Sequence, residues 1–332
     1  MKKFLFLILV VLIIGGFYVH NSIYNPVDVS DSENISINIK KGSNANDVAD
    51  ILTENGLIKN RTLFYGYTRI IGADKDIIAG RYDLNKSMNV PDIIEQISKI
   101  GSSEATITIQ EGLTISQIED KLVEMDVIHD GEFEKAVRNF DSYDDYWFLS
   151  PEIQSELDLP LEGYLYPDTY FIDTVDFNSD AFILLLLDNF QKKIETLKSP
   201  IDSWGNSMHD TITMASILQR EVRTPQDFGL VSGILWKRLD SNWHIGADAT
   251  ILYVTKKTTI NAADLELDSP YNTRLYVGMP PGPISNPDIE HIEAAMHPED
   301  SEYWYYLTTL DTGEVKYARN NDEHNVNKAK YL

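Results

Sequence analysis

The chain has 332 residues, 43% of them hydrophobic, and its 52 acidic and 28 basic residues give a net charge of −24. Such a charge argues against nucleic acid or an anionic membrane surface as a partner. The sequence contains no cysteine, which excludes disulfides, zinc–thiolate sites and a thiol nucleophile.

An unbroken apolar run, Phe4 to Val19, follows Lys2 and Lys3 at the N-terminus. Its Leu, Ile and Val content predicts a transmembrane helix within an anchor of residues 1–22. The lysines should keep the N-terminus in the cytoplasm, so we expect a single-pass protein of the cytoplasmic membrane whose remainder is extracytoplasmic. A cleaved signal peptide is the alternative, but no small-x-small site follows the run. Residues 23–34 are polar and acidic, which is typical of a tether.

An internal repeat follows the tether. In each copy a short strand leads into a glycine turn and an amphipathic helix, and a second helix begins after a polar turn, which indicates a duplicated β-turn-α unit. The predicted strands and second helices are Ile35–Ile39 and Arg61–Tyr67 in the first copy, and Thr106–Ile109 and Glu132–Asn139 in the second. The residues that recur at identical spacings are Ile39, Gly42, Val48, Leu52 and Ile58, matched by Ile109, Gly112, Ile118, Leu122 and Ile128.

The first module, residues 35–104, also contains a predicted strand, Gly80–Leu84, and a predicted helix from Val90 to Ile100. A strand–glycine–helix unit of this size resembles the LysM-like fold. The resemblance implies a module that binds glycan, and a packing scaffold is an equally weighted alternative. Residues 105–200 comprise the second repeat unit and a connection that ends in a predicted helix, Ala181–Leu197.

Two parts of this connection are predicted to lack regular structure. Asp141 to Leu159 is acidic and aromatic, and Leu161 to Tyr170 is dense in tyrosine and turn residues. Tyrosine rings beside carboxylates can stack on sugar faces, although tyrosine-rich loops more often close a core. Both interpretations remain open.

The predicted catalytic domain, residues 201–332, opens with a helix from Asp210 to Val222 that carries one carboxylate on its apolar face. At about 100° per residue, Glu221 projects between Ile217 and Met214. Asp210 is a predicted N-cap. Burial and the negative end of the helix dipole both penalise the ionised form of Glu221. Its pKa should therefore rise toward neutrality, as a general acid requires.

A structural role is the alternative for this glutamate. Glu221 would then lie at the margin of the apolar stripe and pair with Arg220, Arg223 or a distant base. Periodicity alone favours that structural role.

The rest of the domain is predicted to combine helices, a rigid loop and a hairpin, which makes the chain an α+β protein. The loop, Gly278–Pro287, is rich in proline and should form a preorganised groove wall. The other predicted elements are a helix at Phe228–Leu239 packed beside the Glu221 helix, a strand or helix after Asp248, a helix at His291–Met296, and a hairpin of Tyr303–Thr309 and Val315–Ala318 around Asp311-Thr-Gly313.

Several kinds of catalytic site lack their motifs in this sequence. No HExxH motif supports a metal site, no GxSxG motif supports a serine hydrolase, and no glycine-rich phosphate loop is present. We therefore predict neither a metal nor a cofactor. A carboxylic acid in a groove lined by Tyr, Asn and Pro suits cleavage of a glycosidic bond. Asp248 is the other acid in a comparably patterned site, and whether it approaches Glu221 is left open.

Several linked motifs follow one another along the chain: Glu162-Gly-x-Leu-x-Pro-Asp-Thr-Tyr170, Ala215-Ser-Ile-Leu-Gln-Arg-Glu221, Val231-x-x-Ile-Leu-Trp-Lys-Arg-Leu239, Asp248-x-Thr-x-x-Tyr253, Ser269-Pro-Tyr-Asn-Thr273, Gly278-x-Pro-Pro-Gly-Pro-Ile284, Asn286-Pro287 and Glu323-His-Asn325. In this order they resemble the YceG/MltG-like endolytic murein transglycosylases, and the resemblance covers the chain from the first repeat to the C-terminus. That family also has one N-terminal membrane helix and a LysM-like subdomain before its catalytic domain.

Two positions depart from the family pattern. The family usually has two glutamates two residues apart, of which the second is the catalytic acid. Here Gln219 replaces the first, while Glu221 remains. Ala249 stands where the family usually has proline after the aspartate, so the turn after Asp248 could differ.

The resemblance implies a mechanism with a single acid. Glu221 protonates the glycosidic oxygen between N-acetylmuramic acid and N-acetylglucosamine, and its carboxylate then takes the proton of the muramic C6 hydroxyl as a 1,6-anhydro ring closes. The resemblance also implies substrate-binding residues that line the groove or hold Glu221: Asp248, Tyr271, Asn272, Thr273, His324 and Asn325. A mutual hydrogen bond between Asp248 and His324 is the structural alternative for that pair.

The sequence therefore predicts a membrane-anchored lytic transglycosylase that cuts nascent peptidoglycan and ends strand elongation. Its partners would be glycan strands and, as a further candidate, peptidoglycan synthases. One alternative is a non-catalytic peptidoglycan-binding scaffold for the synthesis machinery. Another is a conventional hydrolase that uses a second carboxylate.

Overall fold

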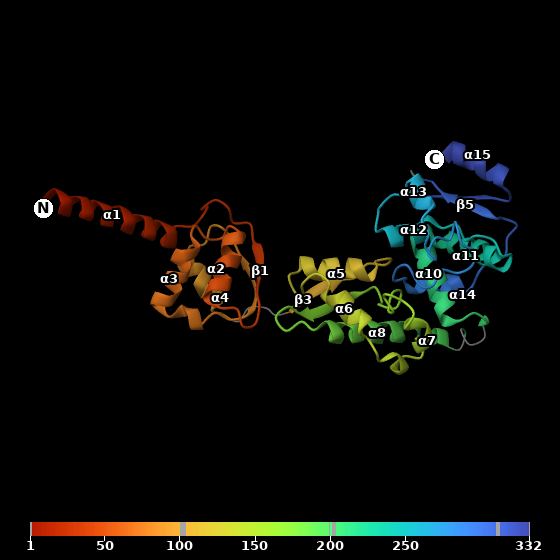
Figure 1. Cartoon of the computed structure of the whole chain (residues 1–332), viewed down its shortest axis with the longest axis horizontal. Helices are drawn as coiled ribbons and strands as arrows, with labels where there is room; N and C mark the ends of the chain where they lie inside the picture. Colours follow the sequence, from red (N-terminus) through yellow and green to blue (C-terminus); the bar gives the residue numbers. More distant parts are fainter. Residues whose placement is uncertain (1, 100–103, 199, 201–203, 310–312, 332) are drawn as a thin grey trace. The chain divides into compact units, whose positions relative to one another are not determined.

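The computed structural model describes residues 2–99, 104–198, 200, 204–309 and 313–331. Within them the chain is α+β, as predicted, because helices alternate with three separate two-stranded sheets, β1-β2, β3-β4 and β5-β6 (Figure 1). The predicted residues Ile100, Asp311 and Thr312 lie outside the described part of the chain. No helix in the described part has both the length and the apolar character needed to cross a membrane.

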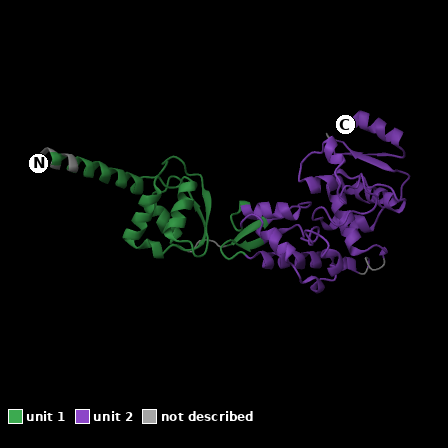
Figure 2. Ribbon diagram, in the orientation of Figure 1, with its two compact units in different colours: residues 1–107, 124–128, 171–177 green, residues 108–123, 129–170, 178–332 purple. Residues whose placement is uncertain are grey.

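The chain forms two compact units (Figure 2). The first comprises residues 1–107, 124–128 and 171–177, and the second comprises residues 108–123, 129–170 and 178–332. The two units are compact parts of the structure and do not test the functional domains predicted from the sequence, which remain predictions.

The first unit packs helices on a short antiparallel sheet. Strand β1 (Ile35–Ile39) pairs with the predicted strand β2 (Gly80–Leu84) from Ile35 opposite Leu84 to Ile39 opposite Gly80. Its helices are α1 (Lys2–Tyr24), α2 (Ala45–Glu54), α3 (Arg61–Ile71), η1 (Ala73–Lys75) and α4 (Val90–Ile97). Their apolar faces bury a continuous core that includes Val48, Leu52, Ile93 and Ile97.

The predicted tether is fixed to this unit. Ile23, near the end of α1, is buried in the core. The N–H of Asp28 donates to the carbonyl of Lys86 at 3.0 Å, and the ammonium of Lys86 lies 2.9 Å from the Asp31 carboxylate.

The second copy of the repeat forms the elements that the sequence predicts. They are β3 (Glu104–Thr108), α5 (Ile115–Glu124) and α6 (Glu132–Arg138). The main helix of each copy begins with reciprocal side-chain and backbone hydrogen bonds, between Asn44 and Asp47 in α2 and between Thr114 and Gln117 in α5. These capping boxes satisfy N–H groups that have no partner within the helix.

A strand in the connection escaped prediction. Strand β4 (Thr169–Asp173) pairs with β3 and begins inside the tyrosine-rich stretch that was expected to be irregular. Short helical turns lie between the repeat and β4, and helix α8 (Ser179–Ile194) follows β4. These turns are η2 (Tyr143–Asp145) and α7 (Pro151–Gln154), and η3 (Glu195–Leu197) follows α8.

Helix α10 (Met208–Glu221) is the central element of the predicted catalytic domain. Every residue from Thr211 to Leu218 is buried, and helices α11 (Pro225–Asp240), α12 (Asp248–Thr255) and α14 (Ile289–Met296) pack against it. The predicted packing of the Phe228–Leu239 helix beside the Glu221 helix is therefore confirmed. The short helix α13 (Ala262–Leu265) lies between α12 and α14 in the chain.

The predicted N-cap of α10 is wrong. Ser207 occupies that position, and its hydroxyl accepts the N–H of Asp210 at 3.0 Å. Asp210 instead lies in the first turn, where its carboxylate accepts a hydrogen bond from the Ser207 hydroxyl at 2.7 Å. The helix ends at Glu221 because Val222 is extended, and Pro225 begins α11.

The C-terminal part contains the predicted hairpin and an additional helix. Strands β5 (Tyr305–Thr308) and β6 (Val315–Ala318) are antiparallel, with Tyr306 opposite Tyr317. Helix α15 (Asn321–Tyr331) follows and packs on both strands. The proline-rich stretch 278–287 is neither helix nor strand, as expected, and the N–H of Ile284 donates to the Ser216 hydroxyl of α10 at 3.0 Å.

Candidate active site

Glu221 is the last residue of α10, and its side chain is partly buried where three elements meet. The hydroxyl of Tyr306, from β5, donates to Glu221 Oε2 at 3.1 Å. Thr308, on the same face of β5, donates through its hydroxyl to the Glu221 carbonyl at 3.3 Å. The backbone N–H of Ala249, in the first turn of α12, also donates to the carboxylate. Two strand residues and one helix start therefore hold this glutamate.

Asp248 and Arg274 form an ion pair next to this carboxyl group. Arg274 Nε lies 2.5 Å from Asp248 Oδ1, and both side chains are about half exposed, at 44% and 52%. Asp248 is the first residue of α12, directly before Ala249, and its negative charge raises the pKa of Glu221. Because Asp248 pairs with Arg274, the predicted alternative of a mutual hydrogen bond with His324 is not what this structure contains.

The surroundings of Glu221 have opposing effects on its pKa. Burial raises the pKa of the Glu221 carboxyl above its ordinary value, and the nearby charge of Asp248 acts in the same direction. The hydroxyl of Tyr306, the N–H of Ala249 and the cation of Arg274 favour the ionised form and limit the rise. The raised pKa therefore favours the protonated carboxyl of Glu221, while Tyr306 and Ala249 are placed to stabilise the carboxylate once it forms.

The two arginines nearest to Glu221 in the sequence, Arg220 and Arg223, do not neutralise it. Arg220 Nη1 donates to the carbonyl of Gly112 at 3.1 Å, and Arg223 is exposed to solvent. Among the residues that the structure describes, no basic side chain forms an ion pair with Glu221 at 4.0 Å or less. Neither Arg220 nor Arg223 therefore forms the ion pair that the structural role requires.

Gln219 has a backbone partner of its own. Its side-chain Oε1 accepts the N–H of Asp288, the N-cap of α14, at 2.9 Å. An amide oxygen can accept this hydrogen bond as a carboxylate would. The replacement of glutamate at this position therefore leaves the contact between α10 and α14 intact.

Tyr271 lies near a second buried carboxyl group, that of Glu162. Its ring packs on Tyr253 with centroids 5.1 Å apart. The hydroxyl of Tyr253, which belongs to α12, hydrogen-bonds to Glu162, and burial raises the pKa of Glu162 to about 8. Burial followed by the charge of Glu162 raises the pKa of Tyr271 to about 12. Helix α12 thus contacts Glu221 through its first turn and Glu162 through Tyr253.

Asn272 and Thr273 are each 1% exposed and bond inside the protein. The Asn272 amide donates to the carbonyls of Leu265 and Leu267 at 3.0 and 2.9 Å. The Thr273 hydroxyl accepts the N–H of Ala247 at 3.1 Å, just before α12 begins. Both side chains thereby hold the loop that carries Arg274 and the start of α12.

His324 and Asn325 lie on α15. The imidazole of His324 stacks on Tyr305, with centroids 5.0 Å apart, and burial lowers its pKa, with the cations of Lys328, Arg238 and Arg274 acting in the same direction. Its Nδ1 is buried and has no hydrogen-bond partner. Asn325 is exposed to solvent. His324 is therefore close to the charged groups around Glu221.

Sequence reasoning missed three residues around these carboxyl groups: Tyr306, Arg274 and Glu162. The predicted hairpin contained the signal for Tyr306, since alternate strand residues face the same side. Glu162 appeared only as part of a motif. Both of its carboxylate oxygens lie 3.2 Å from the N–H of Ile115, at the start of α5.

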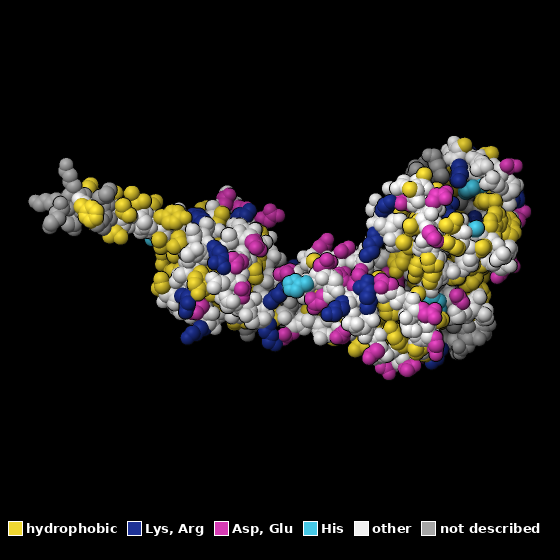
Figure 3. Space-filling model, viewed as in Figure 1, with side chains coloured by type: hydrophobic (Ala, Val, Ile, Leu, Met, Phe, Trp, Pro, Cys, Tyr) yellow, Lys and Arg dark blue, Asp and Glu magenta, His cyan; other side chains and the backbone are white. Residues whose placement is uncertain are grey.

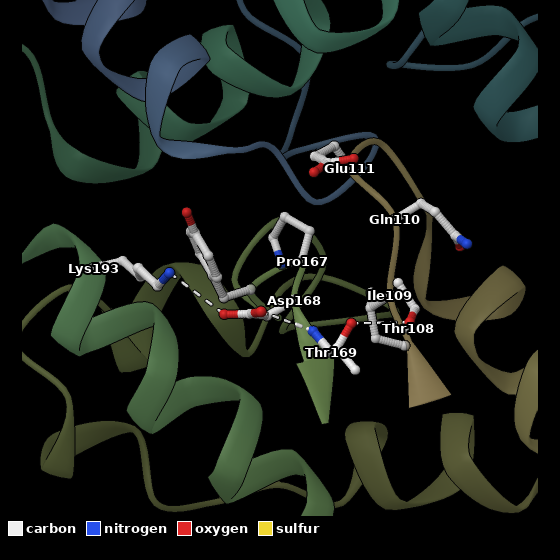
Figure 4. Close-up of a pocket in the computed structure, with 9 residues that line it drawn as sticks. Thr108, Ile109, Gln110, Glu111, Pro167, Asp168, Thr169 and Lys193 are labelled. Carbon is white, nitrogen blue, oxygen red and sulfur yellow. Dashed lines mark hydrogen bonds and ion pairs between the residues drawn. The ribbon is translucent and has the colours of Figure 1, made fainter. Parts of the chain in front are cut away.

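A cavity of about 340 Å³ lies elsewhere in the second unit (Figure 4). It opens where β3 and β4 meet, and Asp168 there contacts the ammonium of Lys193 at 3.4 Å. None of the predicted site residues lines it. The described residues contain no group of three or more His, Cys, Asp or Glu side chains that could hold a metal ion.

Comparison with known proteins relates this chain to one family. Residues 37–330 match the model of the YceG-like family. The endolytic murein transglycosylase of Bacillus subtilis (strain 168) is 32% identical over 97% of this chain and 91% of its own length. The protein of the same name from Streptococcus pneumoniae serotype 2 is 28% identical over 96% of this chain, which spans 62% of that protein. The crystal structure of a YceG-like protein from Listeria monocytogenes superposes with a TM-score of 0.60 and 29% identity, covering 89% of this chain and 99% of that one.

Proposed function

The chain belongs to the YceG-like family, and we propose that it is a lytic transglycosylase that cleaves peptidoglycan glycan strands, with Glu221 as its catalytic acid. The names of the two curated relatives support the reaction, because the similarity extends over nearly the whole chain. The observation that carries the assignment of Glu221 is its setting: a partly buried carboxyl of raised pKa that accepts the hydroxyl of Tyr306.

The reaction needs one group that acts first as an acid and then as a base. Protonated Glu221 gives its proton to the oxygen between N-acetylmuramic acid and N-acetylglucosamine, and the bond from that oxygen to the muramic C1 breaks. Positive charge develops at C1, and the C6 hydroxyl of the same sugar attacks it. The Glu221 carboxylate accepts the hydroxyl proton, so a 1,6-anhydro ring closes without water.

The donors around Glu221 suit both halves of this cycle. Burial favours the protonated carboxyl that must start the reaction. Tyr306 and the N–H of Ala249 stabilise the carboxylate that forms after proton transfer. A proline after Asp248, usual in the family, would have no N–H to donate, so this chain has a donor that the usual family sequence lacks.

Asp248 is assigned an electrostatic role. It adds negative charge next to Glu221 and is paired with Arg274. An oxocarbenium-like centre formed near Glu221 would be stabilised by that charge. The pairing with Arg274 counts against Asp248 as a free nucleophile of a conventional hydrolase.

The other predicted site residues are assigned by their positions. Tyr271 and His324 are candidates for contact with the sugar, because each presents a ring near a charged group of the site. Asn325 is an exposed candidate at the rim. Asn272 and Thr273 are assigned to positioning, since their polar atoms are used inside the protein.

The proposed enzyme acts outside the cytoplasmic membrane, with its N-terminus inside. Large apolar side chains are exposed along α1, among them Phe6 and Phe17, and Figure 3 shows hydrophobic side chains along this helix. We infer that α1 anchors the protein as a single-pass segment. Loss of the protein from the membrane fraction after deletion of residues 1–22 would support this anchor, and retention would contradict it.

The experiment that tests the function compares wild type with Glu221→Gln on purified, uncrosslinked glycan strands. Mass spectrometry of the products separates the hypotheses, because hydrolysis adds a water that an anhydro product lacks. We expect anhydro-muramic ends from wild type and none from the folded variant. Hydrated ends would indicate a hydrolase, and equal glycan binding without cleavage by either protein would indicate a scaffold.

A further inference from the structure

Arg238 of α11 is a partly buried arginine whose guanidinium donates hydrogen bonds to backbone carbonyls. Nε and Nη2 donate to the carbonyl of Trp304 at 3.0 and 2.6 Å. Nη1 donates to the carbonyl of Ile245 at 2.5 Å. One side chain thus joins two segments of the catalytic region that are far apart in sequence.

These two carbonyls precede the two donors of Glu221. Trp304 leads directly into β5, which carries Tyr306, and Ile245 stands just before α12, whose first turn contains Ala249. The guanidinium therefore fixes the backbone of both donor segments at their approach to the catalytic carboxyl. Only a planar fork with several donors can make this set of hydrogen bonds.

The guanidinium also packs against the aromatic rings of the same region. Its carbon lies 5.7 Å from the ring centroids of both Tyr305 and Tyr306, and 5.9 Å from that of Trp243. A cation at this distance from a ring is attracted to it. The ring of Tyr306 is therefore held by Arg238 while its hydroxyl contacts Glu221.

We propose that Arg238 is a positioning residue for the transglycosylase reaction, which holds Tyr306 and the start of α12 against Glu221. The inference rests on the proposed function and adds a residue to it. Arg238 lies behind the two donors and acts through them. Its loss should consequently reduce kcat and leave the KM for glycan strands unchanged.

The pH profile distinguishes positioning from general destabilisation. Besides Tyr306, the charged groups around Glu221 are Asp248 of α12, Arg274 of the following loop and Arg238 of α11. If the donors move away, the Glu221 carboxylate loses stabilisation and its pKa rises. Activity that depends on protonated Glu221 then persists to higher pH.

The decisive variant is Arg238→Lys, because it keeps the positive charge and loses the planar fork. We expect kcat to fall about tenfold or more and the alkaline limb of the kcat profile to move up by about one pH unit. Arg238→Met should lower kcat and shift the alkaline limb in the same way as Arg238→Lys. If charge alone matters, Arg238→Lys will match wild type, which overturns the proposal. A raised KM with normal kcat overturns it as well.

Controls separate this proposal from folding and from the proposed function. Arg319→Lys makes the same change at an arginine whose ion pairs lie on the surface, and it should leave the profile unchanged. Thermal melting establishes that each variant is folded, and Arg238→Lys carries the test if Arg238→Met unfolds.

An additional variant, Tyr306→Phe, should shift the pH profile in the same direction as Arg238→Lys, and combining the two substitutions should add little further shift. Full additivity contradicts a shared mechanism. Inactive wild type, or active Glu221→Gln, rejects the proposed function itself.

Discussion

The hydroxyl of Tyr306 donates to Glu221 Oε2 at 3.1 Å although 85 residues separate the two in the chain. Thr308, on the same face of β5, donates to the Glu221 carbonyl, so the strand holds both the side chain and the backbone at the end of α10. A carbonyl in the last turn of a helix has no partner within the helix, and here β5 supplies one. The carboxyl of Glu221 is thereby fixed by an element that forms only when the C-terminal hairpin has folded.

The first prediction concerns Tyr306→Phe. Removing the hydroxyl removes a donor that stabilises the Glu221 carboxylate, so the pKa of Glu221 should rise further. A general acid is active while protonated, and its activity falls as pH rises through its pKa. The alkaline limb of the kcat/KM profile should consequently move to higher pH, with kcat reduced about tenfold. Tyr305→Phe is the matched control, because it removes a hydroxyl from the neighbouring residue of β5 and keeps the ring that stacks on His324. A limb that is unchanged or moves down would refute the assigned role.

The second prediction is a shift of the pH profile in the opposite direction, toward lower pH. Asp248→Asn removes the negative charge that raises the pKa of Glu221 and leaves the cation of Arg274 without its partner. Both changes favour the Glu221 carboxylate, so the alkaline limb should move to lower pH. Asp240→Asn, at an exposed position at the end of α11, should leave the profile in place. An upward shift for Asp248→Asn would show that its charge does not act on Glu221.

The third prediction compares the two copies of the repeat. Gly42 and Gly112 both have positive φ, +88° and +77°, so alanine should strain either turn by about 1–2 kcal/mol. A Cβ at Gly112 would lie 3.3 Å from Cγ of Gln219 in α10, whereas nothing lies within 4 Å at Gly42. We expect Gly112→Ala to reduce kcat several-fold by displacing the end of α10, which carries Glu221, while Gly42→Ala keeps wild-type kcat. Equal activities would mean that this contact does not position Glu221.

The fourth prediction concerns stability and pH. The pKa of Glu162 is raised to about 8 in the folded protein, so between about pH 4.5 and 8 the folded state binds a proton that the unfolded state has lost. Its contribution should lower the free energy of unfolding as pH rises through this interval, by up to about 1.4 kcal/mol per pH unit. Glu162→Gln should flatten this dependence, measured as melting temperature against pH. The exposed Glu156→Gln should retain the wild-type slope, and a variant at Glu162 that also retains it would contradict the prediction.

The sequence predicted those elements that a short stretch of residues determines by itself, such as turns and amphipathic helices. The repeat was visible because Gly42 and Gly112 stand at matching turns and the apolar residues of α2 and α5 recur at helical spacing. The position of Glu221 on its helix was also a local property. The N-cap was misassigned because Ser207 and Asp210 are both good caps, and the sequence does not show which one begins the helix.

The missed features depend on contacts between distant segments or lack an apolar face. Tyr306 and Arg238 acquire their roles only when the hairpin packs on α10 and α11. Helix α15 buries none of its residues, so it has no apolar periodicity to recognise. Strand β4 begins inside a tyrosine-rich stretch, where composition indicated turns.

The first unit depends on residues that are synthesised late. The amide of Asn38 in β1 donates to the carbonyls of Asp126 and Thr174, each at 3.1 Å, and the ammonium of Lys41 lies 2.9 Å from the Asp176 carboxylate. These acceptors emerge from the ribosome long after β1 itself. The N-terminal unit must therefore remain incomplete during much of translation, and its folding is finished only when residue 177 has been synthesised.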